Sequence, residues 1–236
     1  MQNSKWKMLG QLYRKDMYSL RKELVAIIIF TLLLDGWIFF ASDYPNQAII
    51  VPASLTMGLA FFLPLITSFK MLSQEWSQNT VYLIMSLPVS GALVIGSKLL
   101  AVMSQFLIGT LVAGITGSVM LWFTFPEIHP FIIENFSRLL FVYLFCISGI
   151  LYLCSGSFLS QVIGHLSRRY SGFITVGVFI AILYLVGKLT DLLNIMDSAS
   201  QLPGGITAAV AGGFYLLISL LLMVAAVYLY NYKIEL

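Results

Sequence analysis

Residues 24–41 read LVAIIIFTLLLDGWIFFA, and this stretch decides the fold class. Its single charged residue is Asp35, and the rest is almost entirely apolar. A helix of about 20 mostly apolar residues crosses the hydrocarbon core of a bilayer, which is about 30 Å thick. The stretch therefore predicts a membrane-spanning helix. The polar segment before it is too long for a cleavable signal peptide, so we expect the span to be retained.

The composition of the whole chain extends this prediction. Of its 236 residues, 59% are hydrophobic and only 10% are charged, whereas soluble domains carry about 25% charged residues. A soluble fold of this size has too little interior to hide so much apolar surface. We predict an all-α polytopic membrane protein whose residues 1–236 form a single transmembrane domain. Its six transmembrane helices are residues 24–41, 48–69, 99–125, 139–163, 173–187 and 206–230.

The distribution of lysine and arginine predicts the orientation of this domain. With six spans, both termini lie on the same side of the membrane. Arg138 and Lys188 are the only basic residues on the opposite side, out of 13 in the chain. Because basic residues accumulate in cytoplasmic segments, both termini and the 70–98 segment are predicted to be cytoplasmic. The domain is therefore expected to lie in a membrane that borders the cytoplasm.

The residues before the first span have a helical pattern of their own. Over residues 4–23, apolar residues recur at steps of three and four, and basic residues occupy the other side. The apolar stripe is Trp6, Leu9, Tyr13, Met17, Leu20 and Leu24. Such a helix lies in the plane of the membrane surface, with its cations near anionic headgroups. The alternative is a solvated basic leader that aids insertion.

The longest cytoplasmic segment, residues 70–98, lies between the second and third spans. It mixes polar residues with Trp76, Tyr82 and Leu87, so it is neither a lipid-buried span nor a free linker. Thr80 is a candidate helix cap, and Pro88 ends any helix before it. A short amphipathic element here needs a surface for its apolar side, either the ends of the spans or a soluble partner.

This segment resembles the cytoplasmic stretch of ABC-2-type transporter permeases. The shared pattern is an acidic residue, an Asn-Thr pair where the family has Gly-Thr, a leucine-rich turn, Leu-Pro-Val-Ser and a Lys-Leu-Leu that opens the third span. In this chain it reads Glu75, Asn79-Thr80, Leu83, Ser86-Leu87-Pro88-Val89-Ser90 and Gly96-Ser97-Lys98-Leu99-Leu100. The stretch Leu12-Tyr-Arg-Lys-Asp16 is similar to the family's approach to the first span. Gly91 departs from the pattern, since a basic residue often follows Pro-Val-Ser.

The resemblance implies the membrane-spanning subunit of an ATP-driven ABC exporter. It implies a coupling helix that contacts a separate ATPase subunit, and a second copy of this chain or a paralogous permease as the other partner. The expected ATPase-coupling residues are Glu75, Trp76, Thr80, Leu83 and Pro88. ATP and Mg²⁺ would be bound by the ATPase subunit, with no cofactor in this chain.

No enzymatic site is expected in the chain itself. Residues 91–98 have the spacing of a phosphate-binding loop, but the order is Ser-Lys where Lys-Ser or Lys-Thr is required, and no strand precedes it. His129 and His165 fall on opposite sides of the predicted membrane, so they cannot share a metal ion. Cys146 and Cys154 are too far apart on one helix for a disulfide bond.

Four residues of the first two spans are candidates for a cargo path: Asp35, Met57, Phe61 and Phe62. A carboxyl group inside a span costs about 2.5–3.5 kcal/mol on insertion scales, so it faces other helices or a cavity. Asp35 has either a structural role, hydrogen-bonded or protonated, or a place on the translocation path. The aromatic and aliphatic surfaces suit an amphipathic or hydrophobic cargo. The family resemblance favours a peptide, such as a phenol-soluble modulin or an antimicrobial peptide.

Small residues at four-residue spacing in the third span, Gly109, Ala113 and Gly117, predict a close helix contact. Packing within one chain is favoured over a dimer seam.

The competing function is a self-standing secondary transporter or channel with no ATPase partner. Such a protein uses intramembrane ionisable residues for ion coupling, and Asp35 is the only acidic residue deep in a span. An intramembrane lipid-modifying enzyme would need a catalytic cluster that the sequence does not offer.

Overall fold

A computed structural model describes residues 2–40, 50–77, 90–125, 128–166, 170–193 and 204–234. The fold is all-α. Its helices are α1 (Gln2–Phe40), α2 (Ile50–Ser77), α4 (Gly91–Thr124), α5 (Ile128–Leu166), α6 (Ser171–Leu192) and α8 (Gly204–Ile234). Five of them, α2, α4, α5, α6 and α8, are long and apolar enough to cross a membrane. The predicted span 24–41 forms the second half of α1, which is not among those five.

The described part of each predicted span lies within one helix, apart from residue 125, but the helices extend beyond the spans. Residues 70–77 continue α2 and residues 91–98 form the first turns of α4, so the predicted 70–98 loop is helical at both of its ends. Hydropathy identifies only the apolar part of a helix, and charged residues in these extensions lower their hydropathy. The extensions are nevertheless helical, because their charged side chains have partners on neighbouring helices, as described below.

The predicted surface helix, residues 4–23, is continuous with the first span in α1. The helix has no break between its basic half and its apolar half. Its in-plane orientation in the membrane stays a prediction.

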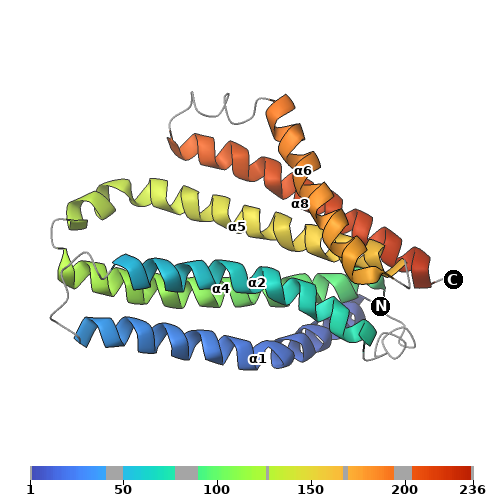
Figure 1. The fold of residues 1–236 in the computed structure, drawn as a ribbon, viewed down its shortest axis with the longest axis horizontal. Coiled ribbons are helices and arrows are strands. Elements are labelled where there is room, and N and C mark those ends of the chain that lie inside the picture. The colour runs from blue at the N-terminus through green and yellow to red at the C-terminus, as the bar shows by residue number, and fades with distance from the viewer. Residues whose placement is uncertain are drawn as a thin grey trace.

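The helices pack in two groups that meet at α5 (Figure 1). In the first group α4 packs against both α1 and α2, and in the second α5 packs against α6 and α8; α2 and α5 join the groups. Both ends of the chain lie at the same end of the bundle, together with the last turns of α2 and the first turns of α4 (Figure 1).

Small residues bring α4 close to α2 inside the chain. A Cβ atom added at Gly109 would lie 3.4 Å from the Cβ of Ala60, and one at Gly117 would lie 3.8 Å from that of Ala53. Two of the three small residues predicted for a close contact therefore face α2 of the same chain, as favoured from the sequence.

The core is richest at the end of the bundle that holds both termini. Fully buried side chains there include Leu72 of α2, Ile95 and Val102 of α4, and Phe158 and Val162 of α5. This packing surrounds a group of charged side chains.

Candidate functional site

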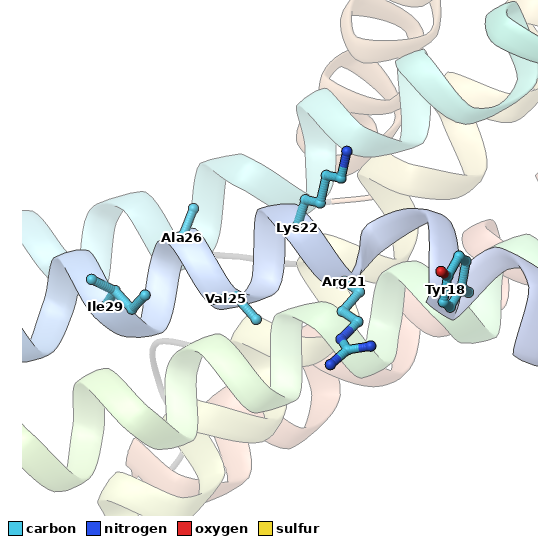
Figure 2. Close-up of a pocket in the computed structure, with 6 residues that line it drawn as sticks. All are labelled: Tyr18, Arg21, Lys22, Val25, Ala26 and Ile29. Atoms are coloured by element: carbon cyan, nitrogen blue, oxygen red, sulfur yellow. The ribbon is translucent and has the colours of Figure 1, made fainter.

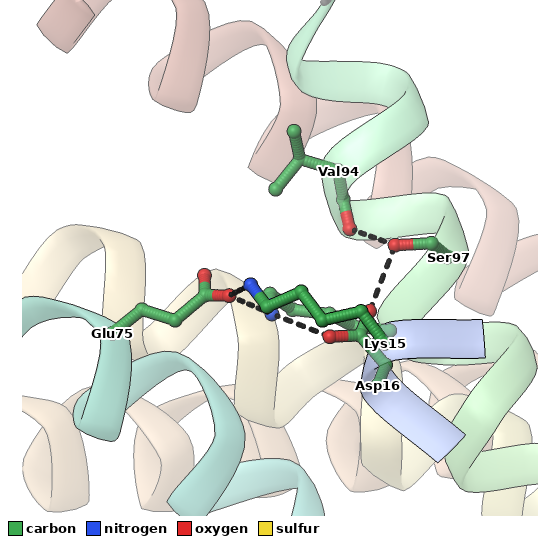
Figure 3. Close-up of polar contacts among 6 residues, drawn as sticks. Lys15, Asp16, Glu75, Val94 and Ser97 are labelled. Atoms are coloured by element: carbon green, nitrogen blue, oxygen red, sulfur yellow. Dashed lines mark hydrogen bonds and ion pairs between the residues drawn. The ribbon is translucent and has the colours of Figure 1, made fainter. Parts of the chain in front are cut away.

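Charged side chains from three helices meet inside the bundle near its terminal end. Figure 3 shows Lys15 and Asp16 of α1, Glu75 of α2 and Ser97 of α4 converging. With Lys98 of α4 they form what we call the buried charge cluster, defined as Lys15, Asp16, Glu75, Ser97 and Lys98.

Lys98 is the centre of the cluster. Its Nζ atom lies 2.7 Å from Oε1 of Glu75 and 3.5 Å from Oδ1 of Asp16. Lys15 approaches the same Glu75 oxygen at 2.9 Å. The Ser97 hydroxyl lies 3.0 Å from Oδ2 of Asp16, to which it can donate, and 2.9 Å from the carbonyl of Val94. Two cations and two carboxylates thus balance each other across three helices.

The burial of these groups is unusual for charged residues, which are rarely fully buried without partners. The side chain of Lys98 is 2% exposed, that of Asp16 is 5% and that of Glu75 is 10%, whereas Lys15 is 53% exposed. Removing one member of such a group leaves an uncompensated buried charge, which costs several kcal/mol. The cluster therefore fixes the relative positions of α1, α2 and α4.

Burial has a measurable effect on Asp16. Loss of hydration raises the pKa of its carboxyl group above the ordinary value of 3.8, and the neighbouring Lys98 offsets part of that rise. The Ser97 hydroxyl also favours the ionised form, while the nearby Glu75 carboxylate opposes it.

The position of the cluster along the chain is informative. Glu75 lies in the last turn of α2, and Ser97 and Lys98 lie in the second turn of α4. The cluster therefore brackets residues 78–90, which join these two helices, and attaches both sides of that connection to α1.

Further contacts join the same elements. Glu23 of α1 pairs with Lys70 of α2 and accepts a hydrogen bond from Thr67, also of α2, at 3.1 Å. Tyr13 of α1 hydrogen-bonds Ser104 of α4 at 2.9 Å. Along its N-terminal half, α1 is therefore held to both helices by polar contacts.

The start of α4 is also tied to the end of the chain. The backbone N–H of Gly91 donates to Oδ1 of Asn231 in α8 at 3.1 Å. A Cβ atom at position 91 would lie 2.4 Å from that oxygen and 2.6 Å from Cδ1 of Tyr230. The lack of room for a side chain explains the departure from the family pattern, because a basic residue would not fit here.

The structure places two of the five expected coupling residues. Glu75 faces the buried charge cluster, and Trp76 is half-buried with its ring edge-on to His165 of α5, the ring centres 3.7 Å apart. Thr80, Leu83 and Pro88 lie outside the described residues. Contact of these five residues with an ATPase stays a prediction.

The four candidate cargo-path residues do not gather in one place. Asp35 is 3% exposed, its Oδ2 atom accepts a hydrogen bond from Thr116 of α4 at 2.6 Å, and its Oδ1 atom has no hydrogen-bond partner in the described part of the chain. It lines a hollow of about 230 Å³ between α1 and α4 that none of the other three lines. Phe61 packs edge-on against Phe106, Phe62 is exposed, and Met57 is partly buried.

Sequence reasoning missed four members of the cluster as site residues: Lys15, Asp16, Ser97 and Lys98. All four stand in the two stretches that carry the family resemblance. The available signal was that each stretch holds charges on the cytoplasmic side of a predicted span. Within the described ranges, no three His, Cys, Asp or Glu side chains come together as a metal ion would require.

Comparison with known families identifies the family of the chain. The family model described as ABC-2 family transporter protein matches residues 11–231, which include the whole cluster and parts of every helix. The chain belongs to the ABC-2 family of transporter proteins. It is a permease of an ABC transporter, a membrane component and not itself a catalyst. No curated protein and no solved structure matches the chain.

Proposed function

We propose that this ABC-2 permease is the membrane subunit of an ATP-driven exporter, and that a separate ATPase subunit acts on the connection between α2 and α4. The observation that supports the proposal most is the buried charge cluster, because it attaches both sides of that connection to a third helix. ATP and Mg²⁺ would be bound by the ATPase subunit.

The cluster suits the transmission of force. A displacement of residues 78–90 acts on the end of α2 and the start of α4, and a conformational change passes through elements that move as packed units. Ion pairs from Lys98 to Glu75 and Asp16 make α1 move with them. Glu75 would then work from inside the bundle, holding the coupling segment to α1, rather than through direct contact with the ATPase.

The proposed cargo is an amphipathic or hydrophobic molecule, with a peptide favoured. The chain would work in a bacterial cytoplasmic membrane as a pair, with a second copy or a paralogue. Exposed aromatic surface such as Phe62 offers apolar contacts, and Asp35 offers a polar one. Met57 and Phe61, which are partly buried on α2, are further candidates.

The test is co-expression of this chain with an ABC ATPase from the same organism, followed by reconstitution in vesicles. We expect the two to purify together and ATP hydrolysis to drive uptake of a fluorescent amphipathic peptide into inside-out vesicles. Glu75→Gln should leave the complex assembled but reduce transport per ATP hydrolysed, because the coupling segment is released from α1.

Lys70→Gln is the matched control. Lys70 also pairs with a carboxylate of α1, but it is half-exposed and outside the cluster. Its loss should leave transport close to that of the wild type. Transport driven by an ion gradient without any ATPase, or unchanged coupling in Glu75→Gln, would refute the proposal.

A further inference from the structure

A hollow of about 610 Å³ lies along the outer side of α1, away from the buried charge cluster. Six residues line it, all on one face of the helix, and they change character along the axis. Tyr18, Arg21 and Lys22 come first, followed by the apolar Val25, Ala26 and Ile29 (Figure 2). Arg21 reaches to one side of α1 and Lys22 to the other, so the two cations flank the stripe (Figure 2).

Among the described residues near the hollow, the acidic side chains are paired with cations other than Arg21 and Lys22. The described acidic side chains nearby, Asp16, Glu23 and Glu75, are paired with Lys98, Lys70 and Lys15. Arg21 and Lys22 are exposed and form no ion pair or side-chain hydrogen bond within the described ranges. Neither cation therefore has an anionic partner among the described residues.

The apolar half of the hollow begins where the predicted first span begins, at Leu24. Val25 and Ile29 are about half-exposed and open to the surroundings of the bundle. From Lys22 to Ile29 the helix rises about 10 Å. Tyr18 is 75% exposed beside the cations, and tyrosine is common at the level of lipid headgroups.

We propose that this hollow binds an anionic phospholipid from the leaflet on the side of the chain termini. The headgroup phosphate would pair with Arg21 and Lys22, and arginine in particular can donate two hydrogen bonds to a phosphate. One acyl chain would lie along Val25, Ala26 and Ile29. The hollow is of the size that holds a small ligand or part of a lipid. The inference does not depend on the ATPase partner.

The test measures stabilisation of the purified full chain in detergent by added lipid. Phosphatidylglycerol should raise the midpoint of thermal unfolding in a concentration-dependent way, and phosphatidylcholine should not, because only the first carries a net negative charge. Each basic residue near an anionic surface strengthens binding about fivefold, so Arg21→Gln with Lys22→Gln should weaken phosphatidylglycerol binding about 30-fold.

The matched control is Lys7→Gln with Arg14→Gln, which removes the same charge from exposed positions of α1 outside the hollow. It should bind phosphatidylglycerol as the wild type does. Ala26→Phe keeps both cations but fills the apolar half, and it should also weaken binding; Ala26 is exposed, so the core is not disturbed.

Four outcomes would overturn the proposal. The first two are that the control variant loses as much lipid binding as the Arg21/Lys22 variant, or that the Arg21/Lys22 variant binds the lipid unchanged. The third is that glycerol phosphate alone stabilises the chain as much as the lipid does. The fourth is that the Arg21/Lys22 variant loses self-association but keeps lipid binding. The last would assign the face to a second copy of the chain.

Discussion

Lys98 balances two carboxylates at once, and its replacement is the most direct test of the cluster. Lys98→Met keeps the length of the side chain but leaves Asp16 and Glu75 without their buried cation. We expect a loss of about 3–5 kcal/mol of stability, the cost of breaking a buried ion pair. Thermal unfolding in detergent measures it as a lower midpoint.

Two comparisons show whether charge is the cause. Lys70→Met breaks a half-exposed pair and should cost at most about 1 kcal/mol. Lys98→Met combined with Asp16→Asn and Glu75→Gln removes the buried charges together, and it should recover part of the lost stability because no unpaired charge remains. If Lys98→Met is as stable as the wild type, the cluster does not hold the helices.

Asp16 predicts a pH dependence of stability. Because burial raises the pKa of Asp16, the folded chain binds this proton more tightly than the unfolded chain does. Stability from this carboxyl is therefore highest at acidic pH and decreases as the pH rises through the folded-state pKa.

The measurement is the difference in unfolding midpoint between the wild type and Asp16→Asn across a pH series. The asparagine cannot titrate, so we expect the wild type to lose stability relative to the variant as the pH rises from about 4. A difference that stays constant, or changes in the opposite direction, contradicts the raised pKa.

At the scale of elements, the contact between the start of α4 and the end of α8 leads to a test at Gly91. Gly91→Ala puts a methyl group into the space of Asn231 and Tyr230. Overpacking of this kind costs about 1–3 kcal/mol. Gly96→Ala, five residues later in α4, meets no atom within 4 Å and should add about 0.5–1 kcal/mol, since alanine favours a helix.

Thermal midpoints of the two variants should thus move in opposite directions. Equal shifts would mean that α8 does not close on α4 as described. Asn231→Ala combined with Gly91→Ala should relieve only part of the strain, because the ring of Tyr230 remains in the way.

Sequence reasoning located the helices well and their ends poorly. The described part of every predicted span, from residues 24–41 to 206–230, lies within one helix apart from residue 125. Hydropathy could not show that α2 continues through Glu75, or that α4 begins at Gly91, because these turns are polar and are stabilised by partners far away in the sequence.

The same limit applies to the candidate site. Glu75 stood out through the family pattern, but its partners Lys15 and Lys98 are 60 and 23 residues away. Pairing them requires knowing that α1 and α2 both pack against α4. The cargo-path residues were chosen by their chemistry and hydrophobicity along the spans, and this criterion does not say which side chains share a hollow.

On the scale of the whole molecule, the outer surface is apolar along every described helix. Large side chains such as Leu33 of α1, Phe123 of α4, Phe173 of α6 and Leu217 of α8 are mostly exposed. A soluble protein rarely shows apolar surface of this extent. Such a surface suits contact with lipid, in agreement with a multi-pass membrane protein.

The orientation of the bundle in the membrane can be predicted from its charged residues. Both termini, the last turns of α2 and the first turns of α4 lie at one end (Figure 1). Of the 13 lysines and arginines, 11 belong to segments assigned to that end. The end is therefore expected to face the cytoplasm, where an ATPase can reach it. A green fluorescent protein joined after Leu236 should fluoresce, and alkaline phosphatase joined there should be inactive. The same pair inserted between Asp43 and Gln47 should give the reverse, and active phosphatase at the C-terminus would place the α2–α4 connection on the wrong side for any cytoplasmic motor.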